Sequence, residues 1–353
     1  MRSIIAGTGI SLPPTVVTNE DLTRVMDTDP EWISSRTGVL ERRIASPGQT
    51  SSSLGAEAGA AALEDAGLAP QDVDALIVAT MTPDFYAPGP APLVQHAMGL
   101  ERSIPAFCIR QQCSGFLYGL EMGDALIASG KAANVLVIGT EVHAGVQPWI
   151  TGWDRLQEEG IPPTPEEWDL ATRNRAWAVL FGDGAGAVAL QASDDDSVGV
   201  LATRLFTDGD HFDLIHIPAL GSASRPFIDV GQIEREEHIP IMQGPLLYRQ
   251  AVRLMPEALN TVLEEIGCTT DDLDLVVAHQ ANERILDGVR KRMGVDATVV
   301  PQNLQHYGNT TAGTLPILFH ELKEQGRVES GMLVGFVAFG AGAHWGASLY
   351  RVP

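Results

Sequence analysis

An internal repeat limits the folds open to this 353-residue chain. The segment LEDAGLAPQDVDALIVA at residues 63–79 aligns without a gap with LEEIGCTTDDLDLVVAH at residues 263–279, and Leu, Glu, Gly and two Asp recur at equivalent positions. Each copy predicts an amphipathic helix that ends at a Gly cap, a short acidic turn, and a continuous apolar run typical of a buried strand. The sequence therefore predicts one helix–turn–strand unit that occurs twice.

The later part of each half extends this pattern. NVLVIGTEVHAG at residues 134–145 and MLVGFVAFGAGA at residues 332–343 both predict an apolar strand that runs into a Gly-containing loop. The acidic stretch QASDDDSVG at residues 191–199 lies between the two sets of elements. We expect an N-terminal half at residues 1–193 and a C-terminal half at residues 194–353, packed on each other because no long linker separates them.

Two segments look like additions to a compact half. Residues 145–173 contain tandem prolines and a Pro-Glu-Glu helix start at 165–167, and residues 219–242 are similarly irregular. Long inserted loops usually lie on the surface, and some of them act as lids. We therefore expect an inserted, surface-exposed segment at 145–173, with a helix that starts at 165–167.

Composition excludes several classes of protein. The formal charge of −22 disfavours a general nucleic-acid surface, because phosphate backbones are repelled. The longest apolar stretch, at residues 332–343, is too short and too rich in Gly to span a membrane, and the start of the chain does not resemble a signal peptide. We expect a soluble, cytoplasmic protein.

The three cysteines are not spaced as a disulfide framework or a zinc site. Cys108 and Cys268 are expected to be small buried apolar residues. Cys113 follows an apolar strand-like stretch and precedes a Gly-containing turn and an apolar helix. A helix N-terminus stabilises a thiolate, so this position predicts a lowered thiol pKa and a nucleophile, although a structural cysteine fits the same context.

His279 and Asn309 also lie at junctions. His279 ends the buried strand of the second repeat, and the carboxyl edge of such a sheet is where ligands bind. Asn309 lies in a polar Gly-Asn-Thr turn that leads into an apolar helix. Each has an ordinary alternative, since a His in this place can cap a helix and an Asn beside a Gly is typical of turns.

Two Gly-rich runs, FGAGAHWG at 339–346 and GDGAGA at 182–187, lack the spacing of a phosphate-binding loop. Such runs let backbone N–H groups approach a substrate, as an oxyanion hole requires.

These motifs together resemble the β-ketoacyl-acyl-carrier-protein synthase III family over nearly the whole chain. The opening GTGISLPPTVVTNEDL, then CSGF at 113–116, FGDGAGA at 181–187, HQANERI at 279–285, GNT at 308–310 and FGAGAHWG at 339–346 follow in the family's order. The resemblance implies the thiolase fold, in which two duplicated α/β halves form five layers, αβαβα. It also implies a catalytic triad of Cys113, His279 and Asn309.

The resemblance implies further binding residues. Coenzyme A is expected at Thr28, Trp32, Arg36, Arg175 and Asn282, with Trp32 stacked on the adenine. The acidic carrier protein is expected to dock at Arg284, Lys291 and Arg292. Spacing supports the docking site independently, because positions 284, 288, 291 and 292 share one helical face. A cluster of basic residues on that face stands out in a strongly acidic chain. The ordinary alternative is a solvated helix face.

The implied reaction has two halves. An acyl-coenzyme A acylates Cys113, with the oxyanion held by the backbone N–H groups of Cys113 and Ala341. Decarboxylative Claisen condensation with malonyl-acyl carrier protein then gives a β-ketoacyl thioester, while His279 and Asn309 hold the malonyl carbonyl oxygen. The resemblance implies a homodimer and calls for no metal or redox cofactor, since coenzyme A enters as a thioester substrate.

The sequence departs from the family at Gln111, Gln112 and Ala341, and these changes leave the substrate open. One alternative is an acyltransferase of specialised metabolism that acylates an amine or alcohol without condensation, and another is a non-catalytic partner subunit. A head-to-head long-chain condensing enzyme or a hydroxymethylglutaryl synthase would need a carboxylate where Ala87 lies. The small Ala87, on a loop expected to reach the acyl tunnel of the neighbouring subunit, predicts acyl chains longer than acetyl.

Overall fold

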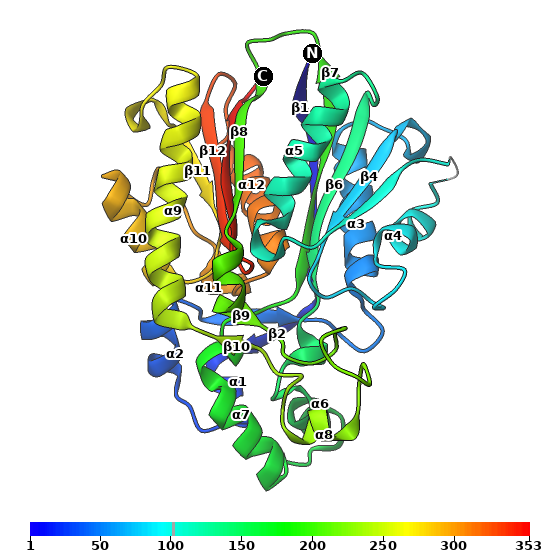
Figure 1. Ribbon diagram of the computed structural model, residues 1–353, viewed down its shortest axis with the longest axis vertical. Coiled ribbons are helices and arrows are strands. Elements are labelled where there is room, and N and C mark those ends of the chain that lie inside the picture. The colour runs from blue at the N-terminus through cyan, green and yellow to red at the C-terminus, as the bar shows by residue number, and fades with distance from the viewer. Residues whose placement is uncertain (101–102) are drawn as a thin grey trace.

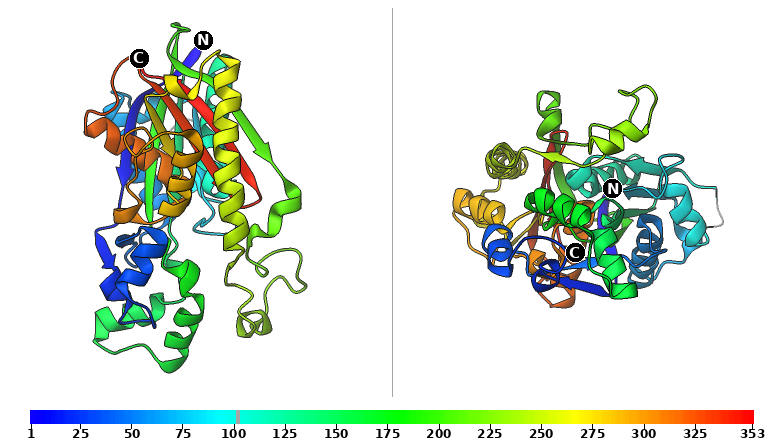
Figure 2. Two further views of the ribbon diagram at one scale, coloured as in Figure 1. Left: turned by 90° about the vertical axis from the view of Figure 1, so that its left-hand side faces the viewer. Right: turned by 90° about the horizontal axis from the view of Figure 1, so that it is seen from below.

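The computed structural model describes residues 1–100 and 103–353. Two β-sheets form the centre of the molecule, one built from each half of the chain (Figure 1). Both termini lie at one end of the sheets, and a smaller helical lobe lies at the opposite end (Figure 2). Within the described residues, no helix combines the length and the hydropathy that crossing a bilayer requires.

The first sheet has five strands in the order β1 (Arg2–Ser11), β7 (Gly184–Ser193), β6 (Asn134–Glu141), β4 (Ala75–Ala79) and β5 (Ala106–Ile109). Strand β4 pairs in parallel with both β5 and β6, whereas β7 runs antiparallel to β6 and β1. All five residues of β4 are buried, as its continuous apolar run predicts.

The second sheet has the order β11 (Leu275–Ala278), β12 (Leu333–Gly340), β13 (His344–Arg351) and β8 (Gly199–Thr207). Strands β11 and β12 are parallel, and β13 is antiparallel to both of its neighbours. These strands are the equivalents of β4, β6, β7 and β1, so the two sheets share one topology. The described strands of the second sheet include no counterpart of β5.

The repeated helix–turn–strand unit is confirmed. Helices α3 (Ser51–Asp65) and α9 (Gly244–Glu265) end at equivalent positions, and β4 and β11 begin at equivalent positions. Gly67 and Gly267 follow the helices with φ angles of +67° and +72°. Glycine adopts this left-handed conformation without a steric penalty, which explains why both copies carry it there.

The elements stack in five layers. Helix α3 covers the outer face of the first sheet, and α9 covers the outer face of the second. Helices α5 (Gly115–Ala128) and α12 (Thr314–Glu324) lie between the sheets, as Figure 1 shows. Their buried side chains, including Phe116 and Phe319, join both sheets in one core. The predicted duplicated α/β fold with an αβαβα arrangement is therefore confirmed.

The segment 145–173 is more ordered than the inserted surface loop that the sequence predicts, whereas the predicted helix start at 165–167 is confirmed. It contains α6 (Ile150–Glu159) and the first part of α7 (Pro165–Ala178). The hydroxyl of Thr164 accepts the N–H of Glu167, whose carboxylate accepts the N–H of Thr164, and this capping box starts α7. Trp149 and Trp153 are buried, so apolar packing makes the segment part of a folded lobe.

The same lobe contains the N-terminal elements β2 (Thr15–Thr18), α1 (Asn19–Leu22), α2 (Pro30–Thr37) and β3 (Glu41–Ile44). Residues 219–242 are irregular, as predicted, with the short helix α8 (Val230–Glu234) between the paired strands β9 (Ile215–His216) and β10 (Ile241–Met242). The chain passes from the first sheet to the second between Ser193 and Gly199, where the sequence predicts the division into halves.

Cys108 differs from its prediction. It lies on β5, the edge strand of the first sheet, and its side chain is exposed within this chain. Cys268 is partly buried. An apolar strand pattern indicates a buried position, but it does not show whether a strand lies at an edge with no neighbour.

Candidate active site

Cys113 lies at the junction that the sequence predicts. Strand β5 ends at Ile109, a single helical turn covers Gln112–Ser114, and α5 begins at Gly115. Gly340, at the end of β12, packs against this turn so closely that a Cβ atom there would lie 3.0 Å from the backbone nitrogen of Cys113. The end of the second sheet thus forms one wall around a nucleophile that belongs to the first.

The predicted lowering of the Cys113 pKa is wrong. Burial, with a smaller contribution from the carboxylate of Glu141, raises the pKa of the thiol to about 12. The side chain is only 7% exposed, and a thiolate there would lose the solvation that water provides. The resting thiol is therefore protonated at neutral pH, and a base must take its proton before it attacks a thioester.

His279 follows directly after β11, at the carboxyl edge of the second sheet. Its ring is buried, and burial lowers its pKa to about 3, so the imidazole is neutral. Its Nδ1 atom lies 2.8 Å from the hydroxyl oxygen of Thr314, the first residue of α12. A neutral imidazole can accept a proton on its other nitrogen.

Asn309 lies in the turn between α11 (Leu304–Tyr307) and α12. Its backbone N–H donates to Leu180 at 2.8 Å, and its side-chain oxygen accepts the N–H of Thr311 at 2.8 Å. The preceding Gly308 has a φ angle of +63°, and a Cβ atom there would lie 2.6 Å from the carbonyl oxygen of Leu180. The turn therefore needs a glycine to bring Asn309 to this place.

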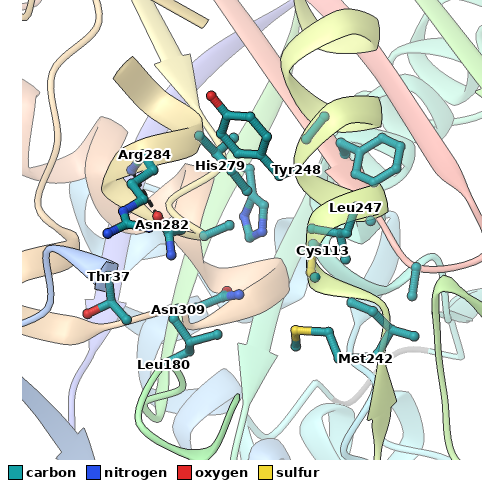
Figure 3. A pocket seen from close by; sticks show the side chains of 18 of the residues that line it. Thr37, Cys113, Leu180, Met242, Leu247, Tyr248, His279, Asn282, Arg284 and Asn309 are labelled. Carbon is teal, nitrogen blue, oxygen red and sulfur yellow. Dashed lines mark hydrogen bonds between the residues drawn. The ribbon is translucent and has the colours of Figure 1, made fainter. Parts of the chain in front are cut away.

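One cavity of about 730 Å³ brings these three side chains together. Cys113, His279 and Asn309 project toward a common space in Figure 3, although they come from three separate parts of the chain. Ala341 also lines this cavity, and its N–H finds no backbone acceptor among the described residues. A thiol, a neutral imidazole and a carboxamide thus face one space, and Ala341 forms part of its wall.

The cavity has an apolar wall and a basic mouth. Among its apolar lining residues are Ile215, Met242, Leu247, Met255 and Phe339. Three arginines also line it, Arg36, Arg249 and Arg284, and all three are exposed. Because the whole chain has a formal charge of −22, this arrangement favours an anionic ligand whose uncharged part enters the cavity.

Arg249 and the wall residues Ile215, Met242, Leu247 and Met255 were missed by the sequence interpretation. Most of them lie in or near α9, which passes along the cavity. No motif marks them, and only the packing of α9 against the second sheet shows which of its side chains reach the site.

Two of the predicted coenzyme A residues contact the indole ring of Trp32. The guanidinium carbon of Arg36 lies 4.9 Å from the ring centre, and that of Arg175 lies 5.0 Å from it. Arg175 also forms an ion pair of 3.4 Å with Asp27. The hydroxyl of Thr28 is buried without a hydrogen-bond partner among the described residues, and Thr28 does not line the cavity.

Asn282 lines the cavity, but its amide is engaged within the protein. Its oxygen accepts the N–H of Arg284 at 2.8 Å and thereby caps α10 (Glu283–Met293), and its nitrogen donates to the carbonyl of Arg36 at 3.1 Å. This residue therefore joins α10 to α2 at the mouth of the cavity.

The three predicted docking residues differ in their surroundings. Arg284 lines the mouth, and Lys291 lies beside it in a second hollow that Tyr248 also lines. Arg292 instead forms an ion pair of 3.1 Å with Glu257 on α9, which partly neutralises it. The exposed basic surface at the mouth therefore consists of Arg36, Arg249, Arg284 and Lys291.

Ala87 is exposed and does not line the cavity of its own chain. It lies in the loop before α4 (Ala91–Ala97). The prediction concerns the loop of a neighbouring subunit, so it stays a prediction.

A buried ionisable group, Glu141, lies behind the nucleophile at the end of β6. It accepts the N–H of Met81 at 2.9 Å and the hydroxyl of Thr82 at 2.7 Å, and burial raises its pKa. Two residues on, the N–H of His143 donates to Asp183 at 2.6 Å. The sequence interpretation missed these residues, and the only signal was two ionisable residues at the end of an apolar strand.

Family models match most of the chain. Residues 263–352 match the model described as 3-oxoacyl-[acyl-carrier-protein (ACP)] synthase III C terminal, and residues 167–209 match that of 3-oxoacyl-[acyl-carrier-protein (ACP)] synthase III. Residues 34–147 match the N-terminal domain of thiolase.

Curated relatives and solved structures agree with these matches. The β-ketoacyl-[acyl-carrier-protein] synthase III of Rhizorhabdus wittichii is 37% identical over 350 residues, which cover 99% of each chain. A crystal structure of 3-oxoacyl-[acyl-carrier-protein] synthase III from Aquifex aeolicus is 38% identical, with a TM-score of 0.84 over 99% of each chain. The structure from Pseudomonas aeruginosa is 34% identical, with a TM-score of 0.85 over 100% of this chain and 99% of that one. Together with the shared cavity of Cys113, His279 and Asn309, these likenesses show that the chain belongs to the β-ketoacyl-[acyl-carrier-protein] synthase III family and has the thiolase fold.

Proposed function

We propose that this protein condenses an acyl group from acyl-coenzyme A with malonyl-acyl carrier protein, with loss of carbon dioxide, to give a β-ketoacyl thioester. One observation supports this most directly: a thiol, a neutral imidazole and a carboxamide face the same cavity. Full-length relatives named β-ketoacyl-[acyl-carrier-protein] synthase III support the same activity.

In the first half-reaction the sulfur of Cys113 attacks the thioester carbonyl, and coenzyme A leaves. The oxyanion that forms is held by the backbone N–H groups of Cys113 and Ala341. Both residues line the cavity, and the Ala341 N–H has no backbone acceptor among the described residues, so it is available to a substrate. Preorganised donors of this kind stabilise the charge that develops in acyl transfer.

In the second half-reaction the malonyl thioester loses carbon dioxide, and its carbonyl oxygen becomes an enolate held by His279 and Asn309. The Asn309 oxygen already accepts the N–H of Thr311, so the amide nitrogen is the atom left to donate to the enolate. The enolate carbon then attacks the acyl group on Cys113. The cycle calls for no metal or redox cofactor, because coenzyme A is itself the thioester substrate.

The basic mouth supports the proposed partners. Arg36 and Arg249 lie where the phosphates of coenzyme A or of a phosphopantetheine arm would pass, and Arg284 and Lys291 extend the basic surface along α10. An acidic carrier protein fits this patch because opposite charges steer association. Since coenzyme A and carrier-protein thioesters are the proposed substrates, we place the reaction in the cytoplasm.

We also propose that the protein acts as a homodimer. Strand β5 is an edge strand with an exposed Cys108, and the nearby loop exposes Phe85 and Tyr86. An unpaired edge beside exposed aromatic side chains is typical of a surface that a second chain covers. In such a dimer the loop with Ala87 could reach the partner's acyl tunnel, as the sequence predicts.

Intact-protein mass spectrometry tests this function. Incubation with a panel of acyl-coenzyme A thioesters should add one acyl mass, which Cys113→Ala should abolish. Addition of malonyl-acyl carrier protein should then remove the acyl mass and release carbon dioxide. Transfer of the acyl group to an amine or alcohol without release of carbon dioxide would instead support the alternative acyltransferase.

A further inference from the structure

The two proposed half-reactions place opposite demands on His279. A protonated thiol at Cys113 needs a base during acylation, whereas the enolate needs a hydrogen-bond donor during condensation. A neutral imidazole carries one N–H group, so its tautomer decides which of these tasks the nitrogen facing the cavity can perform. The residue that fixes this tautomer therefore controls how the cycle begins.

Thr314 contacts His279 in a way that determines the tautomer. The Thr314 hydroxyl oxygen lies 2.8 Å from Nδ1 of His279 and 2.9 Å from the carbonyl oxygen of Thr311. Both Thr314 and His279 are buried, at 2% and 3% exposed, so water does not compete for these atoms. The hydroxyl has a single hydrogen to place in one of two short contacts.

Only one arrangement makes both contacts favourable. If the hydroxyl donated to Nδ1, its oxygen would face the carbonyl oxygen of Thr311 at 2.9 Å with no hydrogen between them, and two lone pairs would repel. If it donates to the carbonyl, it can accept the Nδ1–H of His279, and both contacts are hydrogen bonds of ordinary length. The proton of the neutral ring therefore resides on Nδ1.

We propose that Thr314 is a positioning residue that holds His279 in the Nδ1–H tautomer, so that Nε2 is the base that takes the thiol proton of Cys113. This assignment rests on the proposed function, because it names the step that starts acylation. Burial keeps the ring of His279 neutral, so Nε2 carries a lone pair before substrate binds. Because the same burial makes this nitrogen a weak base, the thiol proton moves only as the sulfur attacks the thioester.

The proton balance closes over the cycle. As the sulfur–carbon bond to the acyl group forms, the thiol proton moves to Nε2. When the bond to coenzyme A breaks, Nε2 passes this proton to the departing thiolate, and the buried ring is neutral again. Nε2 takes up one proton from solvent together with the negatively charged malonyl group, and it donates this N–H to the enolate oxygen that decarboxylation produces. When the enolate carbon attacks the acyl group, the sulfur of Cys113 leaves as a thiolate and takes the proton back from Nε2.

Nitrogen-15 NMR of ring-labelled histidine tests the tautomer directly, with His279→Gln to assign the resonances. The wild-type protein should show a protonated Nδ1 and an unprotonated Nε2. Thr314→Val keeps the shape of the side chain but removes the hydroxyl, and it should lose this preference, whereas Thr314→Ser should retain it. A protonated Nε2 in the resting wild-type protein would overturn the proposal, whether or not the protein is acylated.

Acylation kinetics provide the second test. The loss of a base held in the right tautomer should slow acylation of Cys113 in Thr314→Val by roughly 10- to 100-fold, and Thr314→Ser should restore most of the rate. In a His279→Ala background, Thr314→Val should cause no further loss, because it acts through the imidazole. An equal loss in both backgrounds would show that Thr314 serves the packing of α12 instead. If no acyl-coenzyme A acylates the wild-type protein, the proposed function fails while the NMR result still decides the tautomer.

Discussion

Replacement of Trp32 by alanine should weaken the binding of acyl-coenzyme A without affecting the chemistry at Cys113. The indole lies at the mouth of the cavity, where the predicted adenine would stack on it. In the free protein, Arg36 and Arg175 lie over the ring at 4.9 Å and 5.0 Å. We expect an adenine that stacks on this ring to replace one guanidinium.

The expected loss follows from these two interactions. Stacking of a base on an aromatic side chain contributes about 1–3 kcal/mol. Displacing one cation from an exposed ring costs about 0.5–1 kcal/mol. Taking the middle of each range leaves a net contribution of about 1.2 kcal/mol, and since 1.4 kcal/mol corresponds to a factor of ten, the KM for acyl-coenzyme A should rise roughly sevenfold.

The assay compares two thioesters of the same acyl group. Acylation of Cys113 is followed against the concentration of acyl-coenzyme A and of acyl-pantetheine, which lacks the adenine nucleotide. Trp32→Ala should raise the KM for the first and leave the second unchanged, and the maximal rate should stay the same for both. Trp168→Ala, in α7 of the same lobe but outside the cavity lining, is the matched control. Equal effects of Trp32→Ala on both thioesters would refute the adenine assignment.

Four further outcomes are expected. Asn309→Ala should slow decarboxylation at least tenfold and spare acylation, because its free amide nitrogen faces the enolate; failed acylation would contradict this. Burial keeps the pKa of His279 at about 3, below the usual 6.5. Between these two pH values the unfolded chain binds a proton at this imidazole and the folded protein does not, so acidification favours unfolding. The melting temperature should therefore drop on acidification, and less steeply in His279→Gln; parallel slopes would contradict the shift. Arg284→Glu should raise the KM for a carrier-bound substrate more than Arg292→Glu, because Arg292 is already paired with Glu257; equal effects would remove the distinction. Wild type should acylate faster with hexanoyl- than with acetyl-coenzyme A, and Ala87→Phe should reverse this order; an unchanged order would exclude Ala87 from the acyl tunnel.

Local patterns predicted the parts of this molecule that local physics determines. The repeat at 63–79 and 263–279 gave two helix–turn–strand units because apolar periodicity and Gly caps act within a few residues. Cys113 and His279 could be placed at strand ends for the same reason. The resemblance to a known family was needed to choose these residues over ordinary structural roles.

Properties that depend on packing between distant segments could not be predicted. The thiol pKa follows from burial against Gly340 and the nearby Glu141, both far away in sequence. The role of Arg249 depends on where α9 crosses the cavity, and the hydrogen bond of Thr314 depends on the approach of α12 to β11. The exposure of Cys108 depends on the place of β5 at the sheet edge.

The duplication also explains why one active site is formed instead of two. His279 in the second half corresponds to Ala79 in the first, and the turn at Thr311–Gly313 before α12 corresponds to the turn at Gln112–Ser114 before α5, so Cys113 corresponds to Ala312. Gln112 and Thr311, the first residues of these turns, share the uncommon φ angles of +50° and +43°.

The two alanines lie close to each other at the centre of the molecule. A Cβ atom at Gly115 would lie 2.9 Å from the Cβ of Ala79 and 3.7 Å from that of Ala312. The place that pseudo-symmetry would give to a second thiol and imidazole is therefore filled by small side chains packed between the sheets. Because each half contributes only one of the two groups, Cys113 from the first and His279 from the second, neither half alone contains the site, and the packing of the halves on each other is what creates it.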